Sequence, residues 1–573
     1  MENIFRRRAK EANRRALKEQ EQRLVLARTS IEQNPSDANA YIAAARCCKQ
    51  LGHLYEALEI LKRGISRCAP SPGLYEYYIE RLEKCNQTEE AIAAAREASF
   101  LFPDQIIFSF REALLLPVFY DTPKQVQYYR QRFTEGLLRM IDEVGLESPQ
   151  DREQALIGIG KNVNKYLAYQ ALDDRDLQTL YGNWVHQIMQ VNYPHLTEPR
   201  CQVPKTSDAR LRVGYVSARF RDGSVMKGFS GWLREHNRDV VELFVYHASR
   251  TVDATTRQLK IVSEHFQQLP GELEEAALSV RSNDLHVLVF LDLGMDALMM
   301  QFGALRLAPI QCMAWDYPVT SGLPTIDYCF TGELMEPENA QDHYSEKLVR
   351  LPGVGVSYTK PVIPDSLLFK TRGDFGLREG APVYLSGQTI FKYLPDQDYL
   401  FAQIARRVPN AQFVFLVSNE VLADDFRRRL DGAFSANNLS AADHCVLLPE
   451  VSTLDYWNLH RVSDVVLDTI GWSGGISTFE AIACGLPVVT LPGTFMRGRQ
   501  SSAILTQLGV RDTIAQNDAE YVDLAVRLGL DRRWRRSIID RMVDGYPQLY
   551  SDTRSIRTLE EFYRQVVDER LPT

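Results

Sequence analysis

The clearest structural signal in this chain lies in residues 464–493, DVVLDTIGWSGGISTFEAIACGLPVVTLPG. The segment opens with a β-branched, apolar run, passes through a glycine-rich turn into an amphipathic stretch, and ends in a second β-branched run before Pro492-Gly493. A buried strand, a helix and a second strand joined by short turns form the repeating unit of a parallel sheet. We therefore expect an α/β domain in this part of the chain.

The same alternation of short β-branched runs with helical stretches extends back to Leu211. A proline-marked segment at 361–366 divides it into two series. The expected strands are 211–217, 241–248, 285–293 and 310–315 in the first series, and 383–387, 412–418, 444–450, 464–470 and 487–492 in the second. Two series in tandem predict two doubly wound, Rossmann-like domains that face each other across a cleft, with ligands at the carboxyl ends of the strands.

Residues 1–200 have few glycines and a helical spacing of apolar residues throughout. Within them, Ala57, Leu61, Gly64 and Pro70 recur as Ala91, Ala95, Ala98 and Pro103, close to the 34-residue period of tetratricopeptide repeats. Small residues at this period allow two helices to cross closely. The sequence thus predicts an all-helical, tetratricopeptide-like N-terminal domain.

Four regions follow from these patterns. We expect a tetratricopeptide-like helical domain at 1–145, a helical linker region at 146–205, a first Rossmann-like domain at 206–370 and a second Rossmann-like domain at 371–573. The helix expected at 555–567 is predicted to pack back over the first of the two α/β domains.

Composition limits the classes of function. The chain has 573 residues, a net charge of −8 and 45% hydrophobic residues, which favours a folded multidomain protein and argues against nucleic acid as the main partner. Its nine cysteines are scattered, so we expect reduced thiols and no metal site. Without an 18-residue apolar stretch or an apolar leader, we expect no membrane span and a cytoplasmic location.

The glycine-rich turn is the first candidate site. Glycines let the backbone approach a ligand, and free N–H groups at a helix start suit a pyrophosphate. Glu480 lies one turn further on, within reach of a ribose hydroxyl. The alternative is an ordinary strand-to-helix turn with a hydroxyl cap. The candidate pyrophosphate-binding residues are Gly474, Gly475, Ile476, Ser477 and Thr478.

Other strand ends of the second series add polar groups to the same expected cleft. Lys392 follows the first of these strands and can neutralise a diphosphate leaving group, although a solvated surface lysine is the alternative. The segment 447–457, with Val451 and Tyr456, offers backbone groups and an aromatic edge for a nucleotide base. Arg497 and Arg499 follow a Pro-Gly turn at another strand end.

Several of these segments resemble the O-GlcNAc transferase family, glycosyltransferase family 41. The resemblance rests on LRLAPIQCMAWDYPVTSGLPTIDY (305–328), HYSEKLVRLPG (343–353), the 464–499 block and YDTPKQVQYYRQRFTEGL (120–137), and it is nearest to bacterial members with a short tetratricopeptide-like N-terminus. It implies a GT-B fold, a nucleotide-sugar donor and a polypeptide acceptor presented by the helical domain. The donor in this family is usually UDP-GlcNAc, with UDP-glucose and GDP-fucose users among the relatives, and no further cofactor is implied.

The resemblance also implies roles for single residues. Lys392 matches a lysine that contacts the donor phosphates, with Gln388 near the place of a glutamine, one residue further from the lysine. Ser477 lies in the family's pyrophosphate-binding Thr-Thr turn, where Ile476 replaces the other hydroxyl, and Glu480 stands in place of a ribose-binding aspartate. His265, in SEHFQQLP, resembles a histidine once proposed as the general base; a structural hydrogen-bonding role is the alternative.

The sequence departs from the family pattern near the expected reaction centre. Gly223 stands where the family has a catalytic histidine, and Asp316 stands before Tyr317-Pro318 where relatives have glycine. Gln500 replaces a histidine after Arg-Gly-Arg. Tyr456 and Leu459 fall where some relatives place a histidine and an arginine.

These observations lead to one main hypothesis and two alternatives. The main one is an inverting, metal-independent glycosyltransferase that moves GlcNAc from UDP-GlcNAc to Ser or Thr of a polypeptide, with Lys392 and the 474–478 turn stabilising the leaving nucleotide. His265, Asp316 or a donor phosphate oxygen would take the acceptor proton. The first alternative is a catalytically degenerate scaffold or regulatory subunit that binds protein partners through its helical repeats. The second is a nucleotide-sugar epimerase.

Overall fold

The computed structural model describes residues 2–199, 210–363 and 365–571. The chain forms two compact units, residues 1–143 with 417–428, and residues 144–416 with 429–573. The second unit contains both α/β domains and the helices that immediately precede them. The boundary expected between residues 205 and 206 lies outside the described residues.

The first unit is built from helix pairs. Helix α4 begins 34 residues after α2, and α5 begins 34 residues after α3, so the repeat predicted from the sequence is present as two successive pairs. Gly64 in α3 crosses Tyr41 of α2 so closely that an added Cβ would lie 2.8 Å from the Tyr41 Cγ atom. The helices of this unit are α1 (Glu2–Gln33), α2 (Ala38–Gln50), α3 (Leu54–Arg67), α4 (Pro72–Lys84), α5 (Thr88–Leu101), α6 (Ile107–Leu114) and α7 (Pro123–Glu143).

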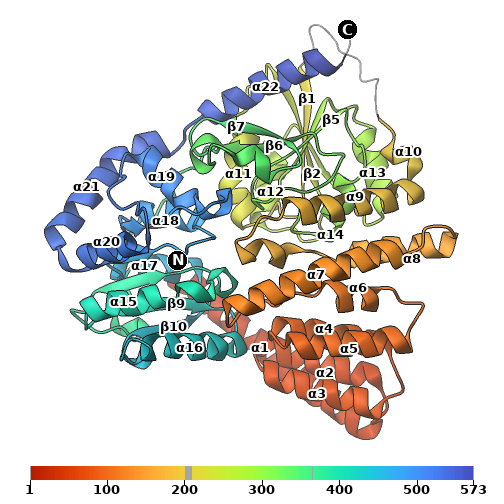
Figure 1. The fold of residues 1–573 in the computed structure, drawn as a ribbon, viewed down its shortest axis with the longest axis horizontal. Helices are drawn as coiled ribbons and strands as arrows, with labels where there is room; N and C mark the ends of the chain where they lie inside the picture. Colours follow the sequence, from red (N-terminus) through yellow and green to blue (C-terminus); the bar gives the residue numbers. More distant parts are fainter. Residues whose placement is uncertain (1, 200–209, 364, 572–573) are drawn as a thin grey trace. The chain divides into compact units, whose positions relative to one another are not determined.

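The first sheet of the second unit has seven parallel strands in the order β3-β2-β1-β4-β5-β6-β7. Figure 1 labels β1, β2, β5, β6 and β7 of this sheet. The order reverses between β1 and β4, which makes a doubly wound sheet with its switch point there. Sequence patterns missed β3, β6 and β7, because their sequences HFQQ, YCFTG and KLVRL contain no continuous β-branched run. The strands are β1 (Leu211–Ser217), β2 (Val241–His247), β3 (His265–Gln268), β4 (Val287–Phe290), β5 (Ile310–Met313), β6 (Tyr328–Gly332) and β7 (Lys347–Leu351).

The second sheet repeats this plan with five strands in the order β10-β9-β8-β11-β12. Its switch point lies between β8 and β11, and every strand predicted for it is present within a few residues. Together the two sheets confirm the predicted pair of doubly wound domains. The strands are β8 (Val383–Ser386), β9 (Gln412–Val417), β10 (Cys445–Pro449), β11 (Val465–Leu467) and β12 (Val488–Val489).

Helices flank these sheets and connect their strands. Those that reach the candidate site are α11 (Ser224–Glu235), α12 (Ala254–Val262), α17 (Thr453–Val462) and α18 (Ile476–Ala483). The others are α8 (Pro149–Lys161), α9 (Arg175–Asn192), α10 (Pro194–Thr197), α13 (Leu273–Arg281), α14 (Ala297–Gly303), α15 (Tyr399–Arg407), α16 (Glu420–Ser435), α19 (Gln500–Leu508), α20 (Asp518–Leu530), α21 (Arg532–Leu549) and α22 (Arg554–Arg570).

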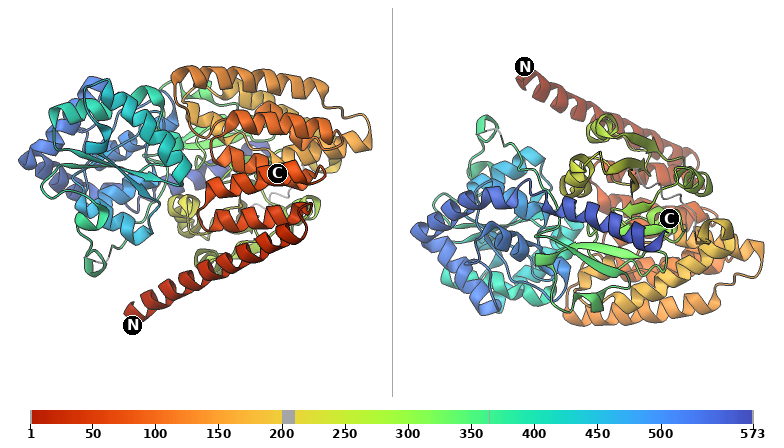
Figure 2. Two further views of the ribbon diagram at one scale, coloured as in Figure 1. Left: turned by 90° about the horizontal axis from the view of Figure 1, so that it is seen from below. Right: turned by 90° about the horizontal axis from the view of Figure 1, so that it is seen from above.

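The last helix, α22, packs beside the first sheet as the sequence predicted (Figure 2). The Tyr563 hydroxyl lies 2.9 Å from that of Tyr215 in β1, and Glu560 lies 3.0 Å from the Nδ1 atom of His236. The range 371–573 expected for the second domain therefore needs a correction, because residues 554–570 pack against the first domain.

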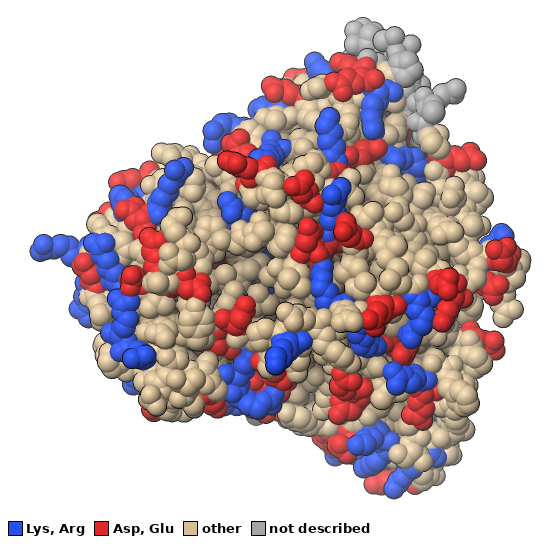
Figure 3. All heavy atoms as spheres, viewed as in Figure 1, with Lys and Arg blue, Asp and Glu red and all other residues tan. Residues whose placement is uncertain are grey.

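Charge is mixed over the surface. On the face drawn in Figure 3, lysines and arginines are interspersed with aspartates and glutamates. Within the described ranges, no helix is both long enough and apolar enough to span a bilayer.

Candidate functional site

The candidate site lies where the strand order of the second sheet reverses. Gln388 and Lys392 follow β8, and the glycine-rich turn follows β11, the strand beside it. Because loops that follow neighbouring strands on either side of a switch point leave a crevice between them, this is the expected ligand position in a doubly wound domain.

Asp468, at the end of β11, fixes the shape of the turn. Its Oδ1 atom accepts a 2.7 Å hydrogen bond from the Gly474 N–H, and its Oδ2 atom accepts bonds from the hydroxyls of Ser473 and Thr490 at 2.6 and 2.7 Å. Burial raises the pKa of this carboxyl in spite of those donors. Sequence reasoning missed Asp468, although it lies inside the most informative segment.

The two glycines leave room for side chains that approach the turn closely. A Cβ at Gly474 would lie 2.6 Å from the Thr478 Oγ1 atom, and a Cβ at Gly475 would lie 2.2 Å from the Oε1 atom of Gln500. Gln500, one of the departures from the family pattern, thus lies against the start of α18. The Thr478 hydroxyl is bonded to Ser501 at 2.7 Å, so it has a structural partner.

Three predicted residues meet at the N-terminus of α18. The Lys392 Nζ atom donates to the Gln388 Oε1 atom at 2.9 Å, and the Gln388 Nε2 atom donates to the Ser477 hydroxyl at 3.4 Å. Burial lowers the pKa of Lys392 to about 8, while the carboxylates of Asp468 and Asp316 oppose that change. The result is a cation and a hydroxyl beside the positive end of a helix, an arrangement that suits a phosphate group.

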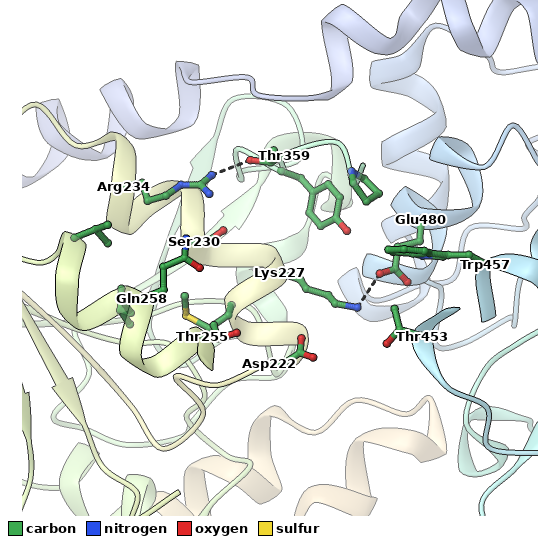
Figure 4. A pocket seen from close by; sticks show the side chains of 15 residues that line it. Asp222, Lys227, Ser230, Arg234, Thr255, Gln258, Thr359, Thr453, Trp457 and Glu480 are labelled. Carbon is green, nitrogen blue, oxygen red and sulfur yellow. Dashed lines mark hydrogen bonds and ion pairs between the residues drawn. The ribbon is translucent and has the colours of Figure 1, made fainter. Parts of the chain in front are cut away.

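Glu480 has a partner that sequence reasoning did not identify. Its Oε1 atom lies 2.8 Å from the ammonium of Lys227, which projects from α11 of the first α/β domain (Figure 4). The pair borders a cavity of about 420 Å³ between the two domains. Lys227 lies close in the sequence to Gly223, where the chain departs from the family pattern. A lysine on an amphipathic helix does not by itself indicate a binding residue.

Trp457 of α17 lines this cavity together with Tyr358, whereas the sequence pointed to Tyr456. Tyr456 faces the loop after β8, where a Cβ on Gly387 would lie 3.2 Å from its Cε2 atom. Val451 is partly buried just before α17 begins. The one-residue difference follows from helix geometry, since neighbouring residues on α17 point about 100° apart.

Asp316 follows β5 in the first sheet and is partly buried. Burial raises its pKa to about 6, with the charges of Arg219 and Lys392 acting in the opposite direction. Gly223 has open space around it, because the nearest atom to an added Cβ is the Arg221 oxygen at 3.9 Å. An added Cβ at Gly223 would therefore meet no closer atom among the described residues.

The structure does not bring three other predicted residues into this group. His265 lies on the edge strand β3, its side chain 48% exposed and its Nε2 atom 2.9 Å from Glu242. Arg497 is buried in an ion pair with Asp174 at 3.2 Å. Arg499 donates to the Gly493 carbonyl at 3.0 Å. Each of these three side chains has a partner within the fold.

Comparisons with known proteins agree with this architecture. A model of the family described as glycosyl transferase family 41 matches residues 184–356 and 355–548. A "Probable UDP-N-acetylglucosamine--peptide N-acetylglucosaminyltransferase SPINDLY" of Oryza sativa subsp. japonica is 28% identical over 382 residues, which make up 64% of this chain and 40% of that protein. The similarly titled SEC of Arabidopsis thaliana is 26% identical over 330 residues, 56% of this chain and 33% of that protein.

A solved structure shares the whole architecture. A mutant O-GlcNAc transferase of Thermobaculum terrenum superposes with a TM-score of 0.70 at 22% identity, covering 93% of this chain and 98% of that one. This likeness shows the fold, with its helical N-terminal region and two Rossmann-like domains. The curated relatives are longer, and the matched region spans about 40% of the length of the rice protein.

Proposed function

The chain belongs to glycosyltransferase family 41, and from this premise we propose that it is an inverting glycosyltransferase with a nucleotide-sugar donor and a polypeptide acceptor. The proposed donor is UDP-GlcNAc, after the titles of the curated relatives, and the proposed acceptor group is a Ser or Thr hydroxyl. UDP-glucose and GDP-fucose are the alternative donors.

The observation that supports this proposal best is the cluster of Gln388, Lys392 and Ser477 at the start of α18. When the bond between the sugar and the diphosphate breaks, negative charge develops on the leaving phosphate. A partly buried ammonium and oriented N–H groups stabilise that charge without reorganising, and one such donor is commonly worth about 10²–10³ in rate.

These fixed charges are the basis for proposing that no divalent metal is needed. Lys392 and the helix N-terminus would supply the electrostatic stabilisation that a metal ion provides in other transferases. Transfer measured with and without EDTA tests this point: equal rates support it, and loss of activity that Mg²⁺ or Mn²⁺ restores contradicts it.

The helical unit offers a place for the polypeptide. A hollow of about 800 Å³ lies among its first helices, lined by Arg23, Ile42, Arg46 and Tyr77 among others. Arg46 lies over the Tyr77 ring, with its guanidinium carbon 5.4 Å from the centroid. Glu76 and Glu80 also line the hollow, so this mixed surface suits an extended peptide that carries apolar side chains and charges of both signs.

The test is donor hydrolysis and sugar transfer by the wild type and by Lys392→Ala. We expect both rates to fall by about 10²-fold or more in the variant. Lys347→Ala, which removes an exposed lysine from the edge strand β7, is the matched control and is expected to behave as the wild type. Equal rates in Lys392→Ala and the wild type would remove the assignment.

A further inference from the structure

Three strand ends of the first sheet bring charged side chains together. Arg219 follows β1, Asp292 follows β4 and Asp316 follows β5, and β1, β4 and β5 are neighbours at the switch point. The Arg219 Nε atom lies 3.9 Å from the Asp292 Oδ2 atom. The charge of Asp316 contributes to raising the pKa of Asp292 to about 7, a rise due mainly to complete burial, so the two carboxyls interact.

Several buried polar atoms of this cluster have no hydrogen-bond partner. Within the described part of the chain, Oδ1 of Asp292, Oδ2 of Asp316, Nε of Arg219 and Nε1 of the adjacent Trp315 are all buried without a hydrogen bond. Leaving such an atom unpaired costs about 1–3 kcal/mol, so several together indicate a site that a polar ligand completes.

Asp316 is linked through aromatic rings to the cluster of Gln388, Lys392 and Ser477. The Lys392 Nζ atom lies 5.4 Å from the centroid of the Trp472 ring, and that ring lies 6.4 Å from the ring of Tyr317, the residue after Asp316. The charges of Asp316 and Lys392 also shift each other's pKa, although the two residues come from different domains. The other neighbours of Asp316 are the Arg219 guanidinium and the Ser224 hydroxyl at the start of α11. A free carboxylate oxygen thus lies beside the group proposed to bind the leaving phosphate.

Resting on the proposed function, we propose that Asp316 is the catalytic base of this transferase, and that Arg219 and Asp292 are positioning residues that hold its carboxylate. The acceptor hydroxyl oxygen forms a bond to the sugar C1 atom as the bond from C1 to the phosphate oxygen breaks. The hydroxyl proton passes to the Asp316 Oδ2 atom, and the nucleoside diphosphate leaves with the bonding electron pair beside Lys392.

The groups around Asp316 determine the expected pH dependence. Arg219 and Lys392 face it from β1 and β8, and the phenol of Tyr169 responds to its charge. Asp292 is in turn surrounded by Arg219, Asp296 and the Ser217 hydroxyl. A base must be deprotonated to act, so transfer is expected to decrease as pH falls below about 6, the pKa of Asp316.

Asp316→Asn tests the assignment directly. We expect the kcat for transfer to fall by about 10²-fold or more, with the dissociation constant for UDP within about twofold of the wild type and the acidic limb of the pH–rate profile abolished. Asp292→Asn should keep the limb close to its wild-type position, because Asp292 has the higher pKa of the two and is still protonated where Asp316 ionises. A purely structural role for Asp316 would leave the acidic limb in place in Asp316→Asn.

Two further variants keep the result interpretable. Asp540→Asn removes an exposed carboxylate of α21 that pairs with Arg536, and it serves as the charge-matched control. Asp316→Gly, which has the family's usual residue, replaces Asp316→Asn if the latter does not fold. Wild-type kcat and an unchanged acidic limb in a folded Asp316 variant would overturn this inference while the proposed function stands. A wild type that transfers no sugar from any donor would overturn both.

Discussion

Replacing Asp292 by asparagine is expected to stabilise the folded protein at neutral pH, with a gain that disappears in acid. The side chain is fully buried, and its pKa rises from an ordinary 3.8 to about 7. One pKa unit corresponds to about 1.4 kcal/mol, which gives an upper bound of about 4 kcal/mol for keeping this carboxylate ionised. We expect about half of that, because Asp316 shares the titration.

The sign of the pH dependence follows from proton linkage. Between about pH 4 and pH 7 the native carboxyl retains a proton that the unfolded chain has released, so the wild-type free energy of unfolding falls as pH rises. Asparagine does not titrate, and its amide oxygen can accept the 3.2 Å bond that Ala218 N–H makes to Asp292. The variant's advantage should therefore be near zero at pH 4 and about 2 kcal/mol at pH 8.

Thermal unfolding without nucleotide, measured at pH 4.5, 6 and 8, is the assay. The melting temperatures of Asp292→Asn and the wild type should coincide at pH 4.5, and that of the variant should be higher by a few degrees at pH 8. The exposed Asp540→Asn variant should show no such trend. A difference that is independent of pH, or a variant less stable than the wild type at pH 8, would refute the reasoning.

Three further substitutions test other parts of the structure. Gly322→Ala should lower the free energy of unfolding of the second unit in urea by more than about 3 kcal/mol. Gly322 has φ +71°, and an added Cβ would lie 1.9 Å from the Gln178 carbonyl oxygen. A variant as stable as the wild type would contradict this geometry. His265→Asn should transfer sugar at the wild-type rate, and a loss of 10²-fold would return this histidine to the catalytic group. Lys227→Met should lower the free energy of unfolding by about 1–2 kcal/mol and weaken UDP binding, because it leaves the buried Glu480 without its 2.8 Å partner. An unchanged UDP dissociation constant in calorimetry would exclude a role of Lys227 in binding.

The strands that sequence reasoning found are those with long β-branched runs, and this was enough to predict both doubly wound domains. β3, with the sequence HFQQ, has exposed first and last positions, two partly buried positions between them and no apolar run. β12 has only two residues, but the 487–492 pattern located it, because this run ends the strand-helix-strand segment 464–493. Helix α22 was predicted to pack against the first domain, but the range 371–573 predicted for the second domain still included it.

The candidate site was predictable where one chain segment carries it. Gln388, Lys392 and Ser477 could be placed at strand ends from local patterns, and they do meet. Sequence could not reveal Lys227, because its role depends on its contact with Glu480, which lies 253 positions further along the chain in the other domain. It also gave Arg497 a ligand role, whereas the fold commits that guanidinium to Asp174, more than 300 residues away.

Calorimetric titration of the full chain with UDP, and with GDP for comparison, tests the central claim most directly. The account predicts that the wild type binds UDP at one site and that Lys392→Ala weakens this binding by about 10- to 100-fold, the usual effect of losing a hydrogen bond to a charged group. Lys347→Ala should bind as the wild type does. Equal affinity in Lys392→Ala would contradict the account, and a wild type that binds neither nucleotide nor any of their sugars would be a scaffold protein.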